Sequence, residues 1–148
     1  MAEIDPSVIG QWGPETVMHV ELGKVREFAR AVKDPNPIYK DAKACLAPPT
    51  FLMTIAHWID GEGDRRPGIK LDFRRLLHGE QEFEYLKPIR PGDELRARSR
   101  VKETFEKAGK RGGKMLFIIM EQEFRNAQGE VVAYTRNVAI ETEGVVQA

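Results

Sequence analysis

One segment in the second half of the chain restricts the possible folds more than any other. Residues 114–124, KMLFIIMEQEF, carry apolar side chains on both faces of an extended strand. A strand of this kind is buried on both sides, so it belongs at the centre of a sheet. Residues 95–105, LRARSRVKETF, alternate instead between small or apolar residues and a charged series of Arg96, Arg98, Arg100 and Lys102. This alternation predicts a neighbouring strand with one face in water.

Further strands complete the second half of the chain. Residues 70–86 predict either two short strands or one strand that bends at Gly79, and residues 130–141 predict the last strand. The tetrapeptide Asn-Ala-Gln-Gly at 126–129 is typical of a hairpin turn. The second half is therefore predicted to be an antiparallel meander of four or five strands.

The first half of the chain supplies a strand and two helices. Residues 16–22 alternate like a first strand, and residues 25–32 then repeat apolar side chains at the spacing of one helix face. Residues 47–60, APPTFLMTIAHWID, form the most apolar segment, and Pro49 suits a helix start because its missing N–H is no loss there. Since little polar face remains, this second helix is expected to be buried on nearly all sides.

The composition limits the possible classes of function. The 148 residues contain no linker or repeat, so a single domain over residues 1–148 is predicted. Lys and Arg number 23 and Asp and Glu also 23, and this balance favours neither nucleic acid nor an anionic membrane as a partner. The lone Cys45, with no signal-peptide pattern or long apolar run, leads us to expect a cytoplasmic protein.

A turn with the sequence DPNPIY follows the first helix. Asp34 ends the helix, because the residue before a proline is driven out of the helical conformation. Asp34 and Asn36 can hydrogen-bond their own backbone in such a turn. Tyr39 can pack against the second helix, with its hydroxyl bonded to one partner. For Asp34 and Asn36, this local role and a place in an active site both remain open.

Three motifs, in this order, resemble the MaoC-type dehydratase/hydratase superfamily, and within it the N-terminal FAS1-like dehydratase domain subfamily. They are VREFARAVKDPNPIY at 25–39, APPTF at 47–51 and HGEQEFEYLKPIRPGD at 78–93. The resemblance extends over most of the chain and implies an α+β hot-dog fold, in which an antiparallel β-sheet wraps around a central buried α-helix. The predicted order of strands and helices agrees with that fold.

The resemblance also implies a chemistry. Active members add water to the C2–C3 position of an acyl thioester, or remove it, with an Asp and a His five residues later acting as base and acid and an Asn between them. Asp34 and Asn36 match two of these positions. Tyr39 stands in the position of the histidine, and a phenol with an ordinary pKa of about 10 is a poor base near neutrality.

Two segments are candidates for holding the thioester. The resemblance implies that a backbone N–H at the start of the buried helix contacts the thioester carbonyl. Pro49 has no N–H, so Thr50 is the expected substitute, with Phe51 beside it. In the loop KAGKRGGK, Lys110 and Arg111 can clamp a phosphate of CoA, and a solvated hairpin is the alternative.

The histidines predict no metal site and no cofactor is expected. His19, His57 and His78 lack ligand spacing with one another and with Cys45. His78 precedes Gly79, which permits close approach of a backbone or a ligand, so His78 is a secondary catalytic candidate beside a role in the sheet bend.

The sequence therefore predicts a subunit of an (R)-specific enoyl-CoA hydratase or 3-hydroxyacyl-thioester dehydratase of fatty acid or lipid metabolism. Because the histidine is replaced, we expect a substrate-shaping partner that binds a CoA or acyl carrier protein thioester. It would pair as a homodimer or with a MaoC-like hot-dog subunit that carries D-x-N-x-x-H. Three alternatives remain: a self-sufficient homo-oligomeric hydratase using Asp34 with Tyr39, His78 or a water; a hot-dog acyl-CoA thioesterase; and a non-catalytic acyl-thioester binding protein.

Overall fold

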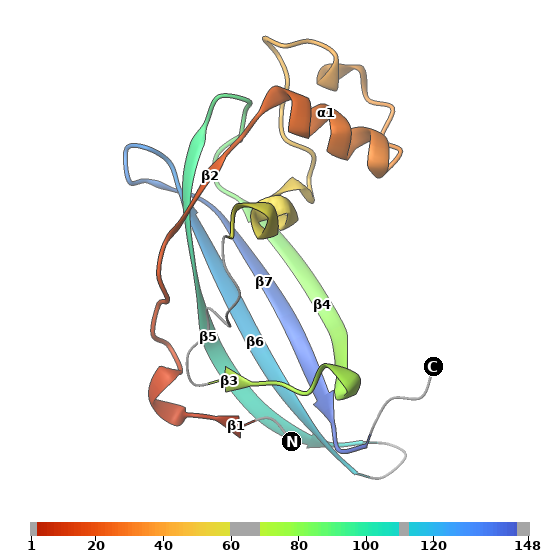
Figure 1. Cartoon of the computed structure of the whole chain (residues 1–148), viewed down its shortest axis with the longest axis vertical. Coiled ribbons are helices and arrows are strands. Elements are labelled where there is room, and N and C mark those ends of the chain that lie inside the picture. Colours follow the sequence, from red (N-terminus) through yellow and green to blue (C-terminus); the bar gives the residue numbers. More distant parts are fainter. Residues whose placement is uncertain (1–2, 60–68, 110–112, 145–148) are drawn as a thin grey trace.

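The main element of the fold is a five-stranded antiparallel sheet in the order β2-β5-β6-β7-β4 (Figure 1). The structure is a computed structural model that describes residues 3–59, 69–109 and 113–144. The strands of this sheet are β2 (Thr16–His19), β4 (Leu76–Tyr85), β5 (Glu94–Ala108), β6 (Lys114–Arg125) and β7 (Val131–Thr142). A second, two-stranded sheet joins β1 (Glu3–Ile4) to β3 (Ile69–Lys70).

The strand predictions for the second half of the chain are confirmed. β6 lies at the centre of the sheet, between β5 and β7, as its two apolar faces indicated. The predicted turn at 126–129 joins β6 to β7, and the Asn126 side chain shapes it by accepting hydrogen bonds from the N–H groups of Gln128 and Glu130. Gly129 ends the turn with a φ of 80°, a left-handed conformation that glycine adopts without strain.

β4 is one strand with a bulge rather than two strands. Its pairing with β7 shifts register between His78 and Glu80, so Gly79 is the bent residue that the sequence indicated. A Cβ atom at Gly79 would lie 2.7 Å from Ile140 Cδ1 and 3.1 Å from the Val138 carbonyl oxygen. A side chain at position 79 would therefore require the Ile140 side chain to move and the two strands to shift slightly apart.

The two longest helices lie toward one end of the sheet, while the short 3₁₀ helices η1 (Pro6–Val8) and η4 (Phe73–Arg75) lie at the other end (Figure 1). α1 (Leu22–Ala31) follows β2, and a 3₁₀ helix, η3 (Phe51–Trp58), packs on the sheet. The expected burial of η3 on nearly all sides is wrong. Side chains three residues apart eclipse one another in a 3₁₀ helix. Four side chains of η3 therefore face the core, and the row of Met53 and Ala56 is exposed, as is His57 near the end of the helix. The four are Phe51, Leu52, Thr54 and Ile55.

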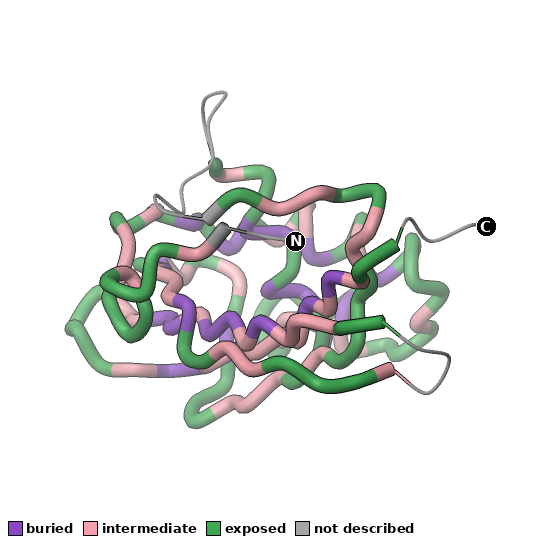
Figure 2. The backbone as a smooth tube through the Cα atoms, turned by 90° about the horizontal axis from the view of Figure 1, so that it is seen from below, coloured by how far each residue is buried: buried purple, intermediate pink, exposed green. Residues whose placement is uncertain are grey.

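The buried residues form two separate apolar clusters along the sheet. The larger cluster, around Phe51, Leu52 and Phe124, joins η3 and α1 to the sheet. The smaller cluster contains Val101, Ile118 and other buried residues, and the N-terminal segment and the residues after β3 cover it. Figure 2 shows the buried stretches gathered inside the molecule, with exposed turns around them. Within the described ranges, no helix has the length and apolarity needed to cross a membrane.

The sheet face that the sequence predicted to be wet carries a layer of ion pairs. Glu121 and Glu123 on β6 are only 3% and 4% exposed. Arg100 bonds to Glu121 and Arg98 to Glu123, while the Trp12 ring stacks over both guanidinium groups at 4.4 and 4.6 Å. The alternation of β5 therefore places its arginines on this face, as the sequence predicted. The carboxylates of Glu121 and Glu123 on β6 are nevertheless buried, because the arginines and the Trp12 ring cover them.

Candidate active site

The loop after α1 is built by its own side chains. Lys33, with a φ of 58°, turns the chain out of the helix. Asp34 Oδ1 then accepts a hydrogen bond from the Asn36 N–H at 3.0 Å, and Asn36 Oδ1 accepts one from the Ile38 N–H at 3.1 Å. The short 3₁₀ helix η2 (Pro37–Tyr39) follows. Asp34 and Asn36 thus have the local role that the sequence left open.

Tyr39 closes this loop onto Asp34. Its hydroxyl donates a hydrogen bond of 2.8 Å to Asp34 Oδ2, and its ring is buried in the larger apolar cluster. Burial first, and then the hydrogen bond and charge of Asp34, raise the pKa of Tyr39 to about 12. The phenol is therefore protonated near neutral pH and acts as a donor rather than as a base.

Arg26 holds the loop against α1. Its guanidinium donates to the carbonyl oxygens of Tyr39 and Lys40 at 3.0 and 2.9 Å. A cavity of about 470 Å³ lies here, and its lining includes Arg30 and Asp34 as well as these three residues. The sequence did not single out Arg26, because a contact across thirteen residues leaves no local pattern.

The start of η3 is fixed separately from this cavity. The Tyr85 hydroxyl donates to the Pro49 carbonyl oxygen at 2.7 Å, and the Phe51 N–H donates to the Pro48 carbonyl oxygen. Thr50 is exposed and Phe51 is fully buried. None of Pro49, Thr50 and Phe51 lines the cavity at Asp34. The rings of Phe51 and Phe28 meet edge to face at 5.6 Å and connect η3 to α1.

The remaining candidates lie away from the loop or outside the described residues. Tyr85 bonds to Pro49 at the start of η3. His78 lies seven residues away from Tyr85 along β4, which corresponds to roughly 23 Å of extended strand. Lys110 and Arg111 lie outside the described residues, and the adjoining ends of β5 and β6 are at the opposite end of the sheet from α1 (Figure 1). In the described ranges, no group of three or more His, Cys, Asp or Glu side chains is placed to hold a metal ion.

We expect Tyr39→Phe to lower the free energy of unfolding by about 1 kcal/mol, because Asp34 Oδ2 loses its donor. Urea denaturation at pH 7 measures the change. Tyr134→Phe is the matched control, since the Tyr134 hydroxyl lies 3.5 Å from Glu123 Oε2, a distance too long for a strong hydrogen bond. Equal stability of Tyr39→Phe and the wild type would show that the Tyr39–Asp34 bond does not hold the loop.

The fold and this loop define a class of protein. A sheet with this strand order, with one helix packed on it, is a hot-dog fold, the fold of solved MaoC-like dehydratases. The family model of the FAS1-like dehydratase domain region matches residues 7–135, and the chain belongs to that family.

Known proteins agree with this assignment. A UPF0336 protein of Streptomyces coelicolor is 36% identical over 146 residues, which are 92% of this chain and 95% of that protein. The HadBC (3R-hydroxyacyl-ACP dehydratase) complex from Mycobacterium tuberculosis has a chain with a TM-score of 0.64 and 22% identity, covering 95% of this chain and 94% of that one. A MaoC-like dehydratase from Phytophthora capsici has a TM-score of 0.72 and 18% identity, and the match covers 95% of this chain and 49% of that one. These two structures show the fold.

Proposed function

We propose that this chain is the substrate-shaping subunit of an (R)-specific enoyl-thioester hydratase or 3-hydroxyacyl-thioester dehydratase, and that it does not hydrate the substrate itself. The hydrogen bond from Tyr39 to Asp34 carries the proposal. The position that resembles the catalytic histidine of active relatives holds a buried phenol. This phenol donates a hydrogen bond to the carboxylate with which the histidine would act.

The chemistry of hydration supports this role. A base must remove a proton from water while an acid delivers one to C2 of the enoyl thioester. Both oxygens of Asp34 already accept hydrogen bonds, from Asn36 and Tyr39. The neighbouring charged groups in the cavity include Arg26, Arg30 and Lys40, whose side chains are hydrogen-bond donors and not acceptors. The cavity can therefore hold an anion better than it can activate a water.

The edge of the sheet supports the need for a partner. β4 ends the strand order and pairs only with β7 among the described strands, so its other edge is open. An open edge strand favours pairing with another chain. We propose that a hot-dog subunit with the motif D-x-N-x-x-H pairs along β4 and supplies the acid and base, while this chain helps to hold a CoA or acyl carrier protein thioester. The HadBC complex, whose chain shares this fold, is named as a 3R-hydroxyacyl-ACP dehydratase.

Hydration of crotonyl-CoA, followed at the enoyl absorbance, tests the proposal. The chain alone should give no rate above that of buffer, and addition of a hot-dog subunit carrying D-x-N-x-x-H should produce turnover. The same subunit with its histidine replaced by alanine is the control and should give none with this chain. Turnover by this chain alone would contradict the proposal, and Asp34→Asn would then test whether Asp34 carries the proton.

A further inference from the structure

The inner face of the sheet, on which η3 packs, carries a band of polar side chains across its middle. Ser99 on β5 lies opposite Gln122 on β6, and Gln122 lies opposite Thr135 on β7. Asn137, two residues further along β7, lies opposite Gln81 on β4. Since strand residues two apart share a face, these five side chains belong to one surface. We call this surface the polar band.

The polar band separates the two apolar clusters of the fold. Toward α1, the same sheet face is apolar where Leu95 and Phe124 meet η3. Toward the other end, it is apolar again at Val101 and Ile118. Packing of η3 alone would favour an apolar surface throughout, because buried polar groups need hydrogen-bond partners. The polar band therefore has no explanation in the packing of the helix.

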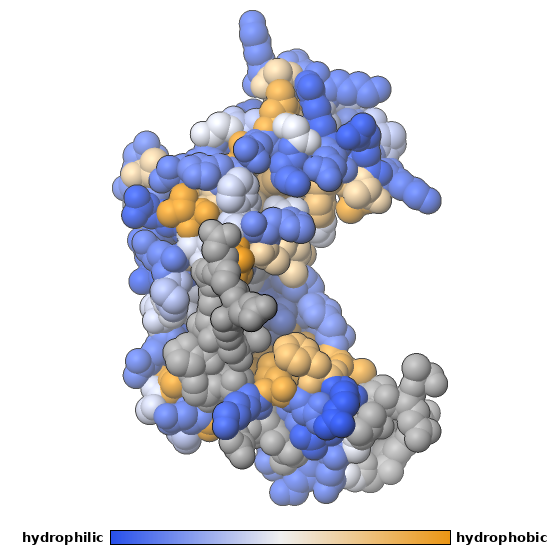
Figure 3. Space-filling model, in the orientation of Figure 1, coloured by the Kyte–Doolittle hydropathy of each residue, from blue (hydrophilic) through white to orange (hydrophobic). Residues whose placement is uncertain are grey.

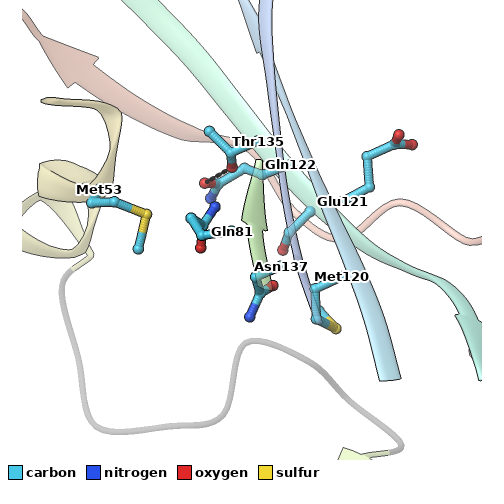
Figure 4. A pocket seen from close by; sticks show the side chains of 8 residues that line it. Met53, Gln81, Met120, Glu121, Gln122, Thr135 and Asn137 are labelled. Carbon is cyan, nitrogen blue, oxygen red and sulfur yellow. Dashed lines mark hydrogen bonds between the residues drawn. The ribbon is translucent and has the colours of Figure 1, made fainter. Parts of the chain in front are cut away.

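A cavity of about 190 Å³ lies over the polar band. Its lining consists mainly of the five polar residues, with Met53 of η3 and Met120 of β6 as apolar walls (Figure 4). The space-filling view shows this side of the molecule hollowed between the end that carries α1 and the end that carries β3 (Figure 3). The exposed row of η3 supplies Met53, so the helix forms one wall of the cavity.

The polar band has unused hydrogen-bonding capacity. Gln81 donates to the Arg136 carbonyl oxygen at 3.1 Å, but its own Oε1 is buried and has no partner within the described ranges. The Thr135 hydroxyl and Gln122 Oε1 are 3.4 Å apart, a long and weak contact. Together the band presents carboxamide and hydroxyl groups, which both donate and accept.

We infer that this cavity binds a section of the acyl chain that carries a hydroxyl or keto oxygen, rather than a plain alkyl section. The inference rests on the proposed function, in which this chain holds the acyl thioester. An alkyl section would remove water from the polar band and return no hydrogen bond. A site built to bond an oxygen rejects an analogue without it more strongly than an apolar pocket rejects an added hydroxyl.

Binding to the ¹⁵N-labelled chain, followed by NMR, tests the inference. The probes are dodecanoyl-CoA, a series of hydroxydodecanoyl-CoA thioesters with the hydroxyl at one carbon from C5 to C11, and free CoA. The best hydroxyacyl probe should bind at least about tenfold more tightly than dodecanoyl-CoA. It should also shift the side-chain carboxamide signals of Gln122 and Asn137, whereas free CoA should not.

Two substitutions assign the effect to the polar band. Thr135→Val keeps the shape of the side chain and removes a hydroxyl, and Asn137→Leu removes a carboxamide, so each should reduce the preference for the hydroxyacyl probe several-fold. Gln128→Leu, at an exposed position in the turn between β6 and β7, is the control and should leave the preference unchanged. Urea denaturation of each variant establishes that it is folded.

The possible results separate the inference from the proposed function. Equal binding of alkyl and hydroxyacyl probes by the wild type would overturn the inference and leave acyl-thioester binding intact. If free CoA shifted the carboxamide signals of Gln122 and Asn137, the polar band would bind the pantetheine arm of CoA, and this result would also overturn the inference. Binding of no probe at all would overturn the proposed function together with the inference.

Discussion

Glu121→Gln is expected to lower the free energy of unfolding by about 3 kcal/mol at pH 7, the cost of removing one member of a buried ionic group. The Glu121 carboxylate is 3% exposed and accepts hydrogen bonds from Arg100, Lys102 and Arg136 at 2.6, 3.2 and 2.7 Å. A neutral amide leaves these three cations, fixed on adjacent strands, without their shared counter-charge. Urea denaturation followed by tryptophan fluorescence measures the loss.

The same substitution should change how stability depends on pH. Burial acts to raise the pKa of Glu121, but hydrogen bonds from Arg136, Arg100 and Lys102 outweigh it and lower this pKa to about 2, from an ordinary value of 4.5. The unfolded chain therefore binds this proton more tightly than the folded one. The stabilisation is complete above the unfolded value of 4.5 and is lost as the pH falls toward 2. The stability difference between wild type and Glu121→Gln should shrink over that range.

Glu130→Gln is the matched control for this prediction. Glu130 forms an ion pair of 2.6 Å with Lys87, but the two side chains are 52% and 47% exposed. An exposed pair contributes at most about 1 kcal/mol. If Glu121→Gln costs no more than Glu130→Gln, or if its cost is the same at pH 7 and pH 3, the buried ion pairs do not stabilise the sheet.

The strands in the second half of the chain were more predictable from the sequence than the helix η3. The apolar faces of residues 114–124 gave the central position of β6, and Gly79 gave the bend of β4, because both follow from local pattern and local sterics. The type of η3 did not follow. The same apolar run satisfies a buried α-helix and a 3₁₀ helix with an exposed row at Met53, and packing against the sheet decides between them.

The candidate site was predictable only as far as its contacts are local. Asp34 and Asn36 bond within their own turn, as their residue types indicated, and the resemblance singled out Tyr39. The hydrogen bond from Arg26 to the Tyr39 carbonyl oxygen joins residues thirteen positions apart, and no periodicity of the sequence predicts such a contact. The polar band was also missed, because Gln122 is brought beside Thr135 by strand register, which the sequence of a single strand does not specify.

Phe51→Ala should be the most destabilising of the substitutions considered, at about 3–5 kcal/mol, the usual cost of removing a fully buried aromatic ring. Phe51 is 0% exposed and lies in the cluster that joins η3 to the sheet. Its ring also meets that of Phe28 at 87° and 5.6 Å, so it links η3 to α1. Urea denaturation at pH 7 measures the loss, and Phe73→Ala is the matched control, with an expected change within about 0.5 kcal/mol because Phe73 is 74% exposed.

A double-mutant cycle between Phe51→Ala and Phe28→Leu tests whether this contact anchors α1. An edge-to-face pair should give a coupling of about 0.5–1.5 kcal/mol beyond the separate losses. Because the loop of Asp34 and Tyr39 begins where α1 ends, a coupling of that size would mean that η3 helps to position the loop through the helix. A large cost for Phe51→Ala without coupling would instead assign the anchoring of α1 to its other buried residues, Val25 and Ala29, and make the loop independent of η3.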